Sequence, residues 1–446
     1  MASSAEAPEE VGAALADAGL DEATEGAFLR ATLCLENADA ETPKPLRAAW
    51  QYVAESYSRN GQGWLTGVLR KADIQSSQVC LANLALALPP SMESWDTIRS
   101  WGTDIEEAYW KQCAISVVRD PSTSANRAVR SLLKAGRPYR ALQVICLAEH
   151  PPGPEGVGPK HVSPELLVGT LRALTTYSIA DERQPPAIGS VSHYVERLFS
   201  LLDGAHVEMA VVAQLEFALL PFLEHTERGP KSLVAAIETT PSVFVDLLKM
   251  VYRAEGEEAR ELSELDRASA RLAYGLLSNL QVVPGTKWTK PSSSDGLGRR
   301  FEGDISFPIG EVDEHVLGSW IKEARTLATE SGRLEMCDQK IGEVFAYAPG
   351  DREHEWPCQA VRSQIEHVKS EALESGIETG IFNKRGVHWR DRGGKQERLI
   401  AQRFRGYATA TQGKWPRTSA VLRQLAETFE RLARREDAEG LVDEFM

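Results

Sequence analysis

The residues best suited to chemistry lie in a basic segment, residues 383–417. Ten lysines and arginines less two carboxylates give this segment a charge of +8, in a chain whose net charge is -14. Cationic donors in a glycine-containing segment suit phosphate groups, and aromatic or guanidinium planes suit stacking on bases. The candidate binding residues are Lys384, Arg385, His388, Trp389, Arg390, Arg392, Lys395 and Arg398.

The same segment has a second interpretation, which we prefer. A run of charge is usually a solvated face. These cations are therefore expected to pair with the acidic remainder of the chain and to hold the last helices in place. Contact with an anion or a nucleic acid is the alternative.

Another cluster has side chains that metal ions accept, namely Asp351, His354, Glu355 and Cys358. A structural metal site usually needs four ligands, and no second ligand pair accompanies this cluster. Acidic residues are also favoured at the start of a helix, where the helix dipole is positive. We interpret the cluster as a helix start and predict no metal ion.

The sequence lacks the short motifs of the common enzyme classes. It has no phosphate-binding loop, no GxGxxG after a strand, and neither an HExxH nor a GxSxG motif. No cofactor is therefore expected, and a non-enzymatic protein is the preferred interpretation. An enzyme with an unrecognised helical active site is kept as an alternative.

Helical periodicity dominates the elements that must position these residues. Leu46, Trp50, Val53 and Tyr57 fall on one face at spacings of three and four. Further along, Gly136-Arg137-Pro138 separates two apolar helices, with glycine ending the first and proline starting the second. Such hairpins are the unit of helical solenoids. The sequence thus predicts an all-α fold of stacked helical hairpins, similar to a solenoid of the tetratricopeptide or HEAT type.

Composition divides the chain into four expected parts. These are an acidic leader at 1–27, poorly ordered or a short helix; a helical-repeat domain at 28–280; a Pro/Gly/Ser-rich loop or linker at 281–310; and a C-terminal helical domain at 311–446 that includes the basic segment. Another irregular segment is expected between Gly376 and Gly394.

The composition indicates a folded chain in a reducing compartment. Of the 446 residues, 42% are hydrophobic and 26% are charged, as in ordinary globular proteins. The six cysteines form no CxxC pair, and most lie among apolar neighbours, as free thiols do. No run approaches the ~18 apolar residues of a membrane helix, and the first ten residues do not resemble a secretion signal. We expect a cytoplasmic protein without membrane association.

Several short phrases resemble the helical C-terminal regions of large bacterial multidomain proteins. Some of those proteins are similar to signal-transducing ATPases or to other immune and conflict-system components. The resemblance spans about residues 95–440 and includes no catalytic signature. The phrases are Asp338-Gln339-Lys340-Ile341-Gly342, Trp356-Pro357, Val361-Arg362, Asn383-Lys384-Arg385-Gly386-Val387, Gly393-Gly394-Lys395-Gln396-Glu397-Arg398 and Trp415-Pro416-Arg417.

Together, the helical pattern and this resemblance favour an interaction module. Stacked helices present extended concave surfaces to partners. We expect a protein partner, and a role as a sensor or regulatory component of a bacterial antiviral defence system. A nucleic-acid-binding protein that uses the basic segment is the alternative.

Overall fold

A computed structural model gives the fold of the chain in two compact units, residues 1–229 and 230–446. The division falls earlier in the chain than the linker expected at 281–310. The described residues are 7–36, 42–114, 121–149, 162–182, 188–223, 226–258, 261–288, 305, 307–351, 355–385 and 394–444.

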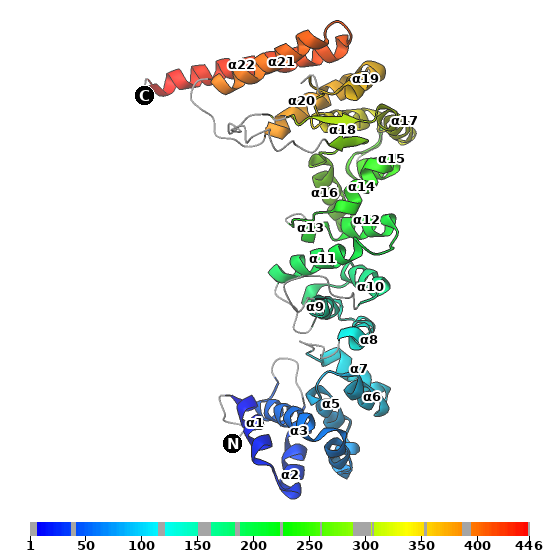
Figure 1. The fold of residues 1–446 in the computed structure, drawn as a ribbon, viewed down its shortest axis with the longest axis vertical. Coiled ribbons are helices and arrows are strands. Elements are labelled where there is room, and N and C mark those ends of the chain that lie inside the picture. Colours follow the sequence, from blue (N-terminus) through cyan, green and yellow to red (C-terminus); the bar gives the residue numbers. More distant parts are fainter. Residues whose placement is uncertain are drawn as a thin grey trace. The chain divides into compact units, whose positions relative to one another are not determined.

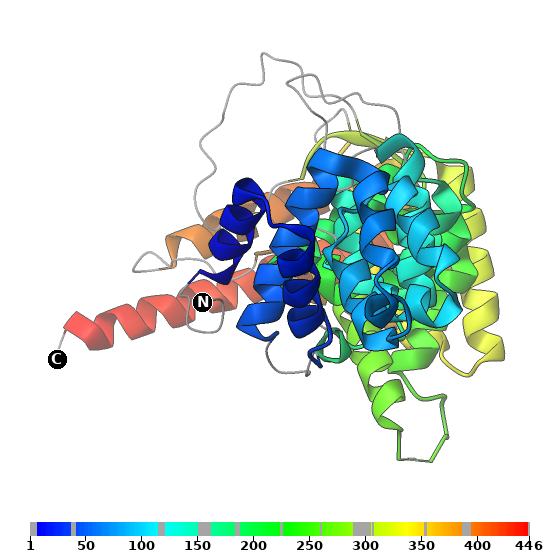
Figure 2. The same ribbon diagram turned by 90° about the horizontal axis from the view of Figure 1, so that it is seen from below.

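Unit 1 consists of helices joined mostly by short connections (Figures 1 and 2). They are α1 Pro8–Ala18, α2 Glu22–Leu33, α3 Lys44–Leu69, α4 Ala72–Gln75, α5 Gln78–Ala87, α6 Met92–Ser100, α7 Thr103–Gln112, α8 Pro121–Lys134, α9 Pro138–Ala148, α10 Pro164–Leu174, the 3₁₀ helix η1 Ile179–Asp181, α11 Ile188–Leu202, α12 Met209–Ala218 and α13 Leu220–Leu223. Along much of the unit, each helix packs on the next helix in the chain or on the one after that: α7 contacts α8, α8 contacts α9 and α10, and α9 contacts α10 and α11.

The turn between α8 and α9 shows how the sequence builds this stack. Gly136 has φ +72°, the left-handed region in which residues with a Cβ atom are strained. The amides of Gly136 and Arg137 donate to the carbonyls of Leu133 and Leu132, at 3.1 and 2.9 Å, which satisfies the last carbonyls of α8. Pro138 then starts α9. The predicted helical hairpin is confirmed.

The start of α9 is capped by a residue from much later in the chain. The carboxylate of Glu182 accepts hydrogen bonds from the amides of Tyr139 and Arg140, both at 2.8 Å. Its Oε1 also lies 3.7 Å from Nε of the buried Arg137. Burial raises the pKa of Glu182, although these partners act in the opposite direction. Glu182 therefore fixes η1 against the α8–α9 hairpin.

One continuous hydrophobic core runs through unit 1, with Trp95 among its largest fully buried side chains. Its indole donates to the hydroxyl of Tyr109 at 3.0 Å, so the polar atom of each ring is satisfied. Cys34 and Cys80 form a disulfide that ties the end of α2 to α5. The expectation of free thiols is therefore wrong for this pair. The free cysteines are Cys113, Cys146, Cys337 and Cys358.

Unit 2 is also built of helices, with one small antiparallel two-stranded sheet in which Thr286 pairs with Val312. Its elements are α14 Lys231–Thr239, α15 Pro241–Val251, α16 Glu264–Ser278, β1 Thr286–Trp288, β2 Gly310–Val312, α17 Glu314–Glu330, α18 Leu334–Phe345, α19 Gln359–Val368, α20 Glu371–Arg385, α21 Lys395–Thr411 and α22 Pro416–Glu444. Across the described ranges of the chain, β1 and β2 are the only strands, which confirms the all-α fold of stacked helices. None of the helices in these ranges has the length and apolar character that crossing a membrane requires.

Three glycines let α18 and α20 pack backbone to backbone. A Cβ atom on Gly376 would lie 2.0 Å from the carbonyl oxygen of Gln339, and one on Gly342 would lie 2.0 Å from that of Leu373. Gly380 is similarly close to the backbone of α18. The prediction of an irregular segment between Gly376 and Gly394 is therefore wrong for residues 376–385, which belong to α20. The glycines there are contact points between helices and not helix ends.

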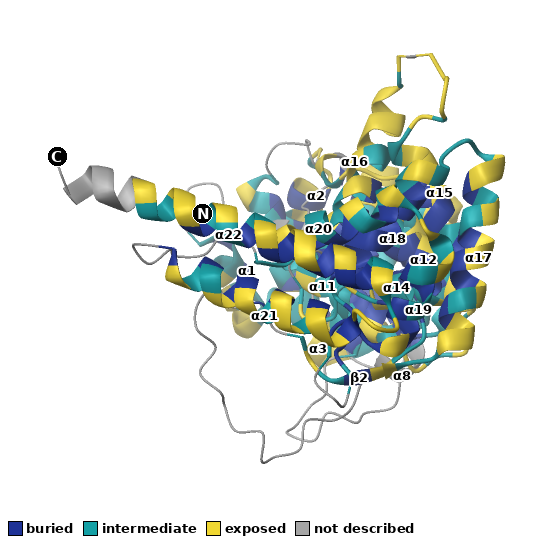
Figure 3. Cartoon of the chain, turned by 90° about the horizontal axis from the view of Figure 1, so that it is seen from above, coloured by how far each residue is buried: buried dark blue, intermediate teal, exposed yellow. Residues whose placement is uncertain are grey.

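The final hairpin of unit 2 pairs α21 with α22 (Figure 3). Along α22, buried and exposed positions alternate at helical spacing, as in an amphipathic helix with one face covered. Phe404 and Phe429 stack across the hairpin with ring centroids 5.9 Å apart. Phe404 also contacts Trp356, which is fully buried.

Candidate binding sites

The structure describes the two ends of the basic segment, residues 383–385 and 394–417. His388, Trp389, Arg390 and Arg392 lie outside the described residues. The other four candidates lie in two helices, Lys384 and Arg385 at the end of α20, and Lys395 and Arg398 at the start of α21. Of these, Lys395 is exposed to solvent.

Lys384 lies in an aromatic environment. Its Nζ lies 4.5 Å from the ring centroid of Phe307 and 5.3 Å from that of Tyr347, and it donates to the carbonyl of Ala346 at 3.2 Å. Burial lowers the pKa of Lys384 to about 8. These contacts hold the end of α20 against the C-terminal end of α18.

Arg385 and Arg398 are bound to carboxylates. Arg385 pairs with Glu397 at 2.6 Å, and both side chains are almost fully buried. Arg398 makes two hydrogen bonds to Asp437, at 2.7 and 2.9 Å. The two arginines therefore connect α20, α21 and α22, and their guanidinium groups are engaged within unit 2.

The carboxylates of the metal-compatible cluster bind an arginine. Asp351 and Glu355 both accept from the guanidinium of Arg362, with Asp351 at 2.6 Å. His354 lies outside the described residues. No group of three or more potential ligands gathers at a metal-binding distance among the residues described. Asp351 and Glu355 thus anchor the first turn of α19, to which Arg362 belongs.

A basic groove is formed in unit 1 by α6, α7 and α8, with a volume of about 710 Å³. Met92, one of the exposed large hydrophobic residues, contributes apolar surface, whereas Trp110 lines the groove but is almost fully buried. The charged residues that line it are Arg99, Lys111, Arg127, Arg130, Lys134, Glu106 and Glu107. This set of residues is hereafter called the α6–α8 groove.

The cations of the α6–α8 groove are mostly uncompensated. Arg127 pairs with Asp96 at 2.6 Å and lies over the ring of Trp95. The other four lysines and arginines form no ion pair with any residue described in unit 1, and all four are exposed. Five cations against two carboxylates leave this groove positive on a chain with a net charge of -14.

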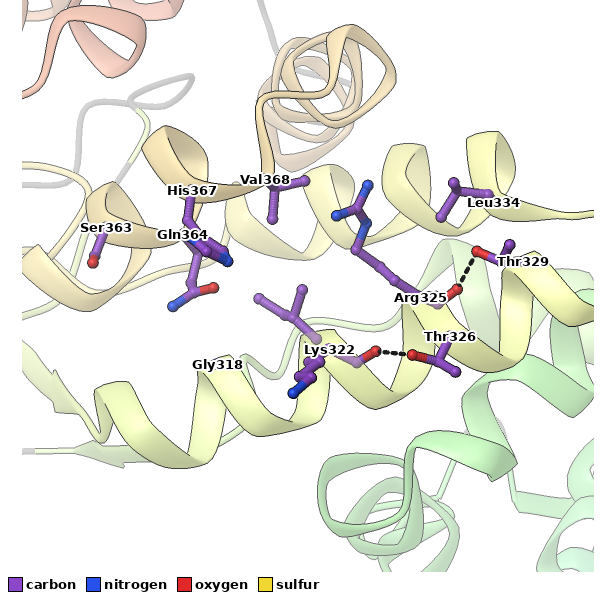
Figure 4. Close-up of a pocket in the computed structure, with 11 residues that line it drawn as sticks. Gly318, Lys322, Arg325, Thr326, Thr329, Leu334, Ser363, Gln364, His367 and Val368 are labelled. Atoms are coloured by element: carbon purple, nitrogen blue, oxygen red, sulfur yellow. Dashed lines mark hydrogen bonds between the residues drawn. The ribbon is translucent and has the colours of Figure 1, made fainter.

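A second cavity lies in unit 2 between α17, α18 and α19, with a volume of about 510 Å³ (Figure 4). Its polar groups include Lys322, Arg325, Gln364 and His367, and Ile321 contributes to its apolar part. The other lining residues are Gly318, Thr326, Thr329, Leu334, Ser363 and Val368. This set is hereafter called the α17–α19 pocket.

The sequence analysis predicted neither cavity, although the spacing of charged residues in α8 indicates part of the α6–α8 groove. Arg127, Arg130 and Lys134 recur at spacings of three and four, which places them on one face of α8. The remaining groove residues come from α6 and α7, and only the packing of three helices brings them together. The α17–α19 pocket has no comparable signal, since Gln364 and Lys322 are ordinary surface residue types separated by 42 positions.

Comparison of the chain with protein-family models, with curated proteins and with solved structures finds no match.

Proposed function

We propose that this chain is a non-enzymatic helical-repeat interaction module that binds an acidic segment of a partner protein. The observation that carries the proposal is the α6–α8 groove, in which four exposed, unpaired cations of the described unit surround the exposed apolar side chain of Met92. An acidic segment supplies carboxylates for the rim, and its apolar side chains cover Met92.

The apolar part of the groove favours a protein segment over a nucleic acid. A nucleic-acid backbone offers evenly spaced phosphates, and its affinity rests on counterion release. An interface between proteins instead combines an apolar centre with a charged rim that guides association. The resemblance to helical regions of bacterial conflict-system proteins supports the wider proposal of a sensor or regulatory component in antiviral defence.

The test is a binding titration by fluorescence anisotropy with the full chain. The probe is a labelled peptide of repeated Glu-Glu-Leu, compared with a Lys-Lys-Leu peptide of equal length at about 50 mM salt, where surface charges are weakly screened. The double variant Arg130→Glu, Lys134→Glu is expected to bind the acidic peptide about tenfold more weakly or worse, because each rim ion pair contributes ~0.2–1 kcal/mol and charge reversal adds repulsion.

A matched control makes the same change of charge elsewhere in unit 1. Lys44 and Arg70 are exposed and lie outside the groove, so Lys44→Glu, Arg70→Glu is expected to bind nearly as well as the unaltered chain. Equal loss in both double variants would show that net charge alone attracts the peptide. Failure to bind the acidic peptide, or tighter binding of duplex DNA through Arg130 and Lys134, would also refute the proposal.

A further inference from the structure

The α17–α19 pocket is lined by a glutamine, Gln364, whose amide has no partner among the described residues. Gln364 is only 8% exposed, and its side chain makes no hydrogen bond to any residue described in unit 2. Figure 4 shows the amide extending from α19 toward α17. The amide atoms themselves are not among the buried polar atoms that lack a partner, so water reaches them from the pocket, and a ligand bound there takes the place of this water.

Gly318 makes room for this amide. A Cβ atom at position 318 would lie 3.2 Å from Nε2 of Gln364, closer than an ordinary contact. Glycine within a helix costs ~1 kcal/mol relative to alanine. Within α17, the glycine is therefore explained by the space that the amide of Gln364 occupies.

The charge of the pocket suits an anion. Its lining includes Lys322, Arg325 and His367 and no carboxylate. Arg325 is held by Asp338 through two hydrogen bonds, at 2.9 and 3.3 Å, so its charge is compensated. Lys322 has no such partner among the described residues and stands exposed at the edge of the pocket.

We propose that the α17–α19 pocket binds a nucleoside phosphate. The amide of Gln364 presents one donor and one acceptor side by side, which is the pairing that a nucleobase edge offers in return. Lys322 binds the phosphate as a compact point charge, and the half-buried Leu334 and Val368 supply apolar surface for the base. The cavity volume of about 510 Å³ is within the usual range for small-molecule sites.

Isothermal titration of the full chain with the four ribonucleoside monophosphates tests this site. Inorganic phosphate and the free nucleosides are measured alongside, because the proposal requires both halves of the ligand. At least one monophosphate is expected to bind more tightly than either half alone. Gln364→Leu and Lys322→Ala should each weaken that binding about tenfold or more.

Gly318→Ala separates binding from folding. The new methyl group pushes the amide of Gln364 out of position, while alanine favours the helix. This variant is expected to bind the nucleotide several-fold more weakly without loss of thermal stability. Gln412→Leu, an exposed glutamine at the end of α21, is the matched control for Gln364→Leu and should bind normally.

Three results would overturn the proposal. They are no binding by any monophosphate, binding of inorganic phosphate as tight as that of the nucleotides, and unchanged nucleotide binding in Gln364→Leu. The α6–α8 groove belongs to the other unit, so failure of either proposal leaves the other standing.

Discussion

Replacing Lys384 by methionine is expected to stabilise unit 2 at neutral pH. Burial lowers the pKa of this lysine from its ordinary value of 10.5 to about 8, so charging it costs more in the folded chain than in the unfolded one. At ~1.4 kcal/mol for each pKa unit, the cost of the buried charge is ~3 kcal/mol. The rings of Phe307 and Tyr347 and the carbonyl of Ala346 offset part of it, because methionine loses these contacts. We expect a gain of ~1–3 kcal/mol.

The gain in stability from Lys384→Met should decrease as the pH rises. Below pH 8, the lysine is charged in both states and the variant has its full advantage. Between about pH 8 and 10.5, the folded chain releases the proton while the unfolded chain keeps it. The stability of the unaltered chain therefore rises over this interval, and the advantage of the variant disappears.

Urea unfolding curves of the full chain provide the assay. Limited proteolysis at each urea concentration, with peptides from α20, α21 and α22 quantified by mass spectrometry, reports on unit 2 separately from unit 1. Lys414→Met is the matched control, since Lys414 lies over the ring of Trp415 but is exposed. A Lys384→Met chain that is less stable near neutral pH, or whose difference from the unaltered chain is the same near pH 10, would refute the reasoning.

Three further substitutions test the packing. Gly136→Val should lower the free energy of unfolding by ~1 kcal/mol or more, because a β-branched residue is strained at φ +72°; an unchanged melting temperature by calorimetry would contradict this. Gly376→Ala should cost ~1–3 kcal/mol, since its methyl group would overlap the carbonyl of Gln339, and a circular dichroism melt that matches the unaltered chain would show that α18 and α20 can separate freely. Glu397→Gln should cost ~3 kcal/mol or more by leaving Arg385 buried without its counter-charge, and a smaller loss in urea unfolding would mean that water reaches this pair.

Glycine shows what local sequence can and cannot predict in this fold. Gly136 sits between an apolar helix and a proline, so its role at a helix end follows from its immediate neighbours. Gly376 and Gly380 have no such neighbours, and their role depends on α18, which lies more than 30 residues earlier in the chain. The all-α fold was predictable because periodicity is local, whereas contacts between helices were not.

The same distinction applies to the candidate sites. Charge density drew attention to residues 383–417, where Arg385 and Arg398 prove to be bound to Glu397 and Asp437. Counting charges along the chain cannot show which of them are compensated in space. The α6–α8 groove is the converse case, because its cations are spread over 36 positions and become a patch only when three helices pack together.

The cap that Glu182 places on α9 has a consequence for synthesis of the chain. Tyr139 precedes Glu182 by 43 residues, and ribosomes add about 5–20 residues per second. The start of α9 and the guanidinium of Arg137 are therefore synthesised ~2–9 s before Glu182, whose carboxylate is their partner in the folded chain. Over that interval water must solvate them, and the α8–α9 hairpin rests on its own apolar contacts and on the helices already made. The start of α9 is thus completed only after η1 and Glu182 have been made.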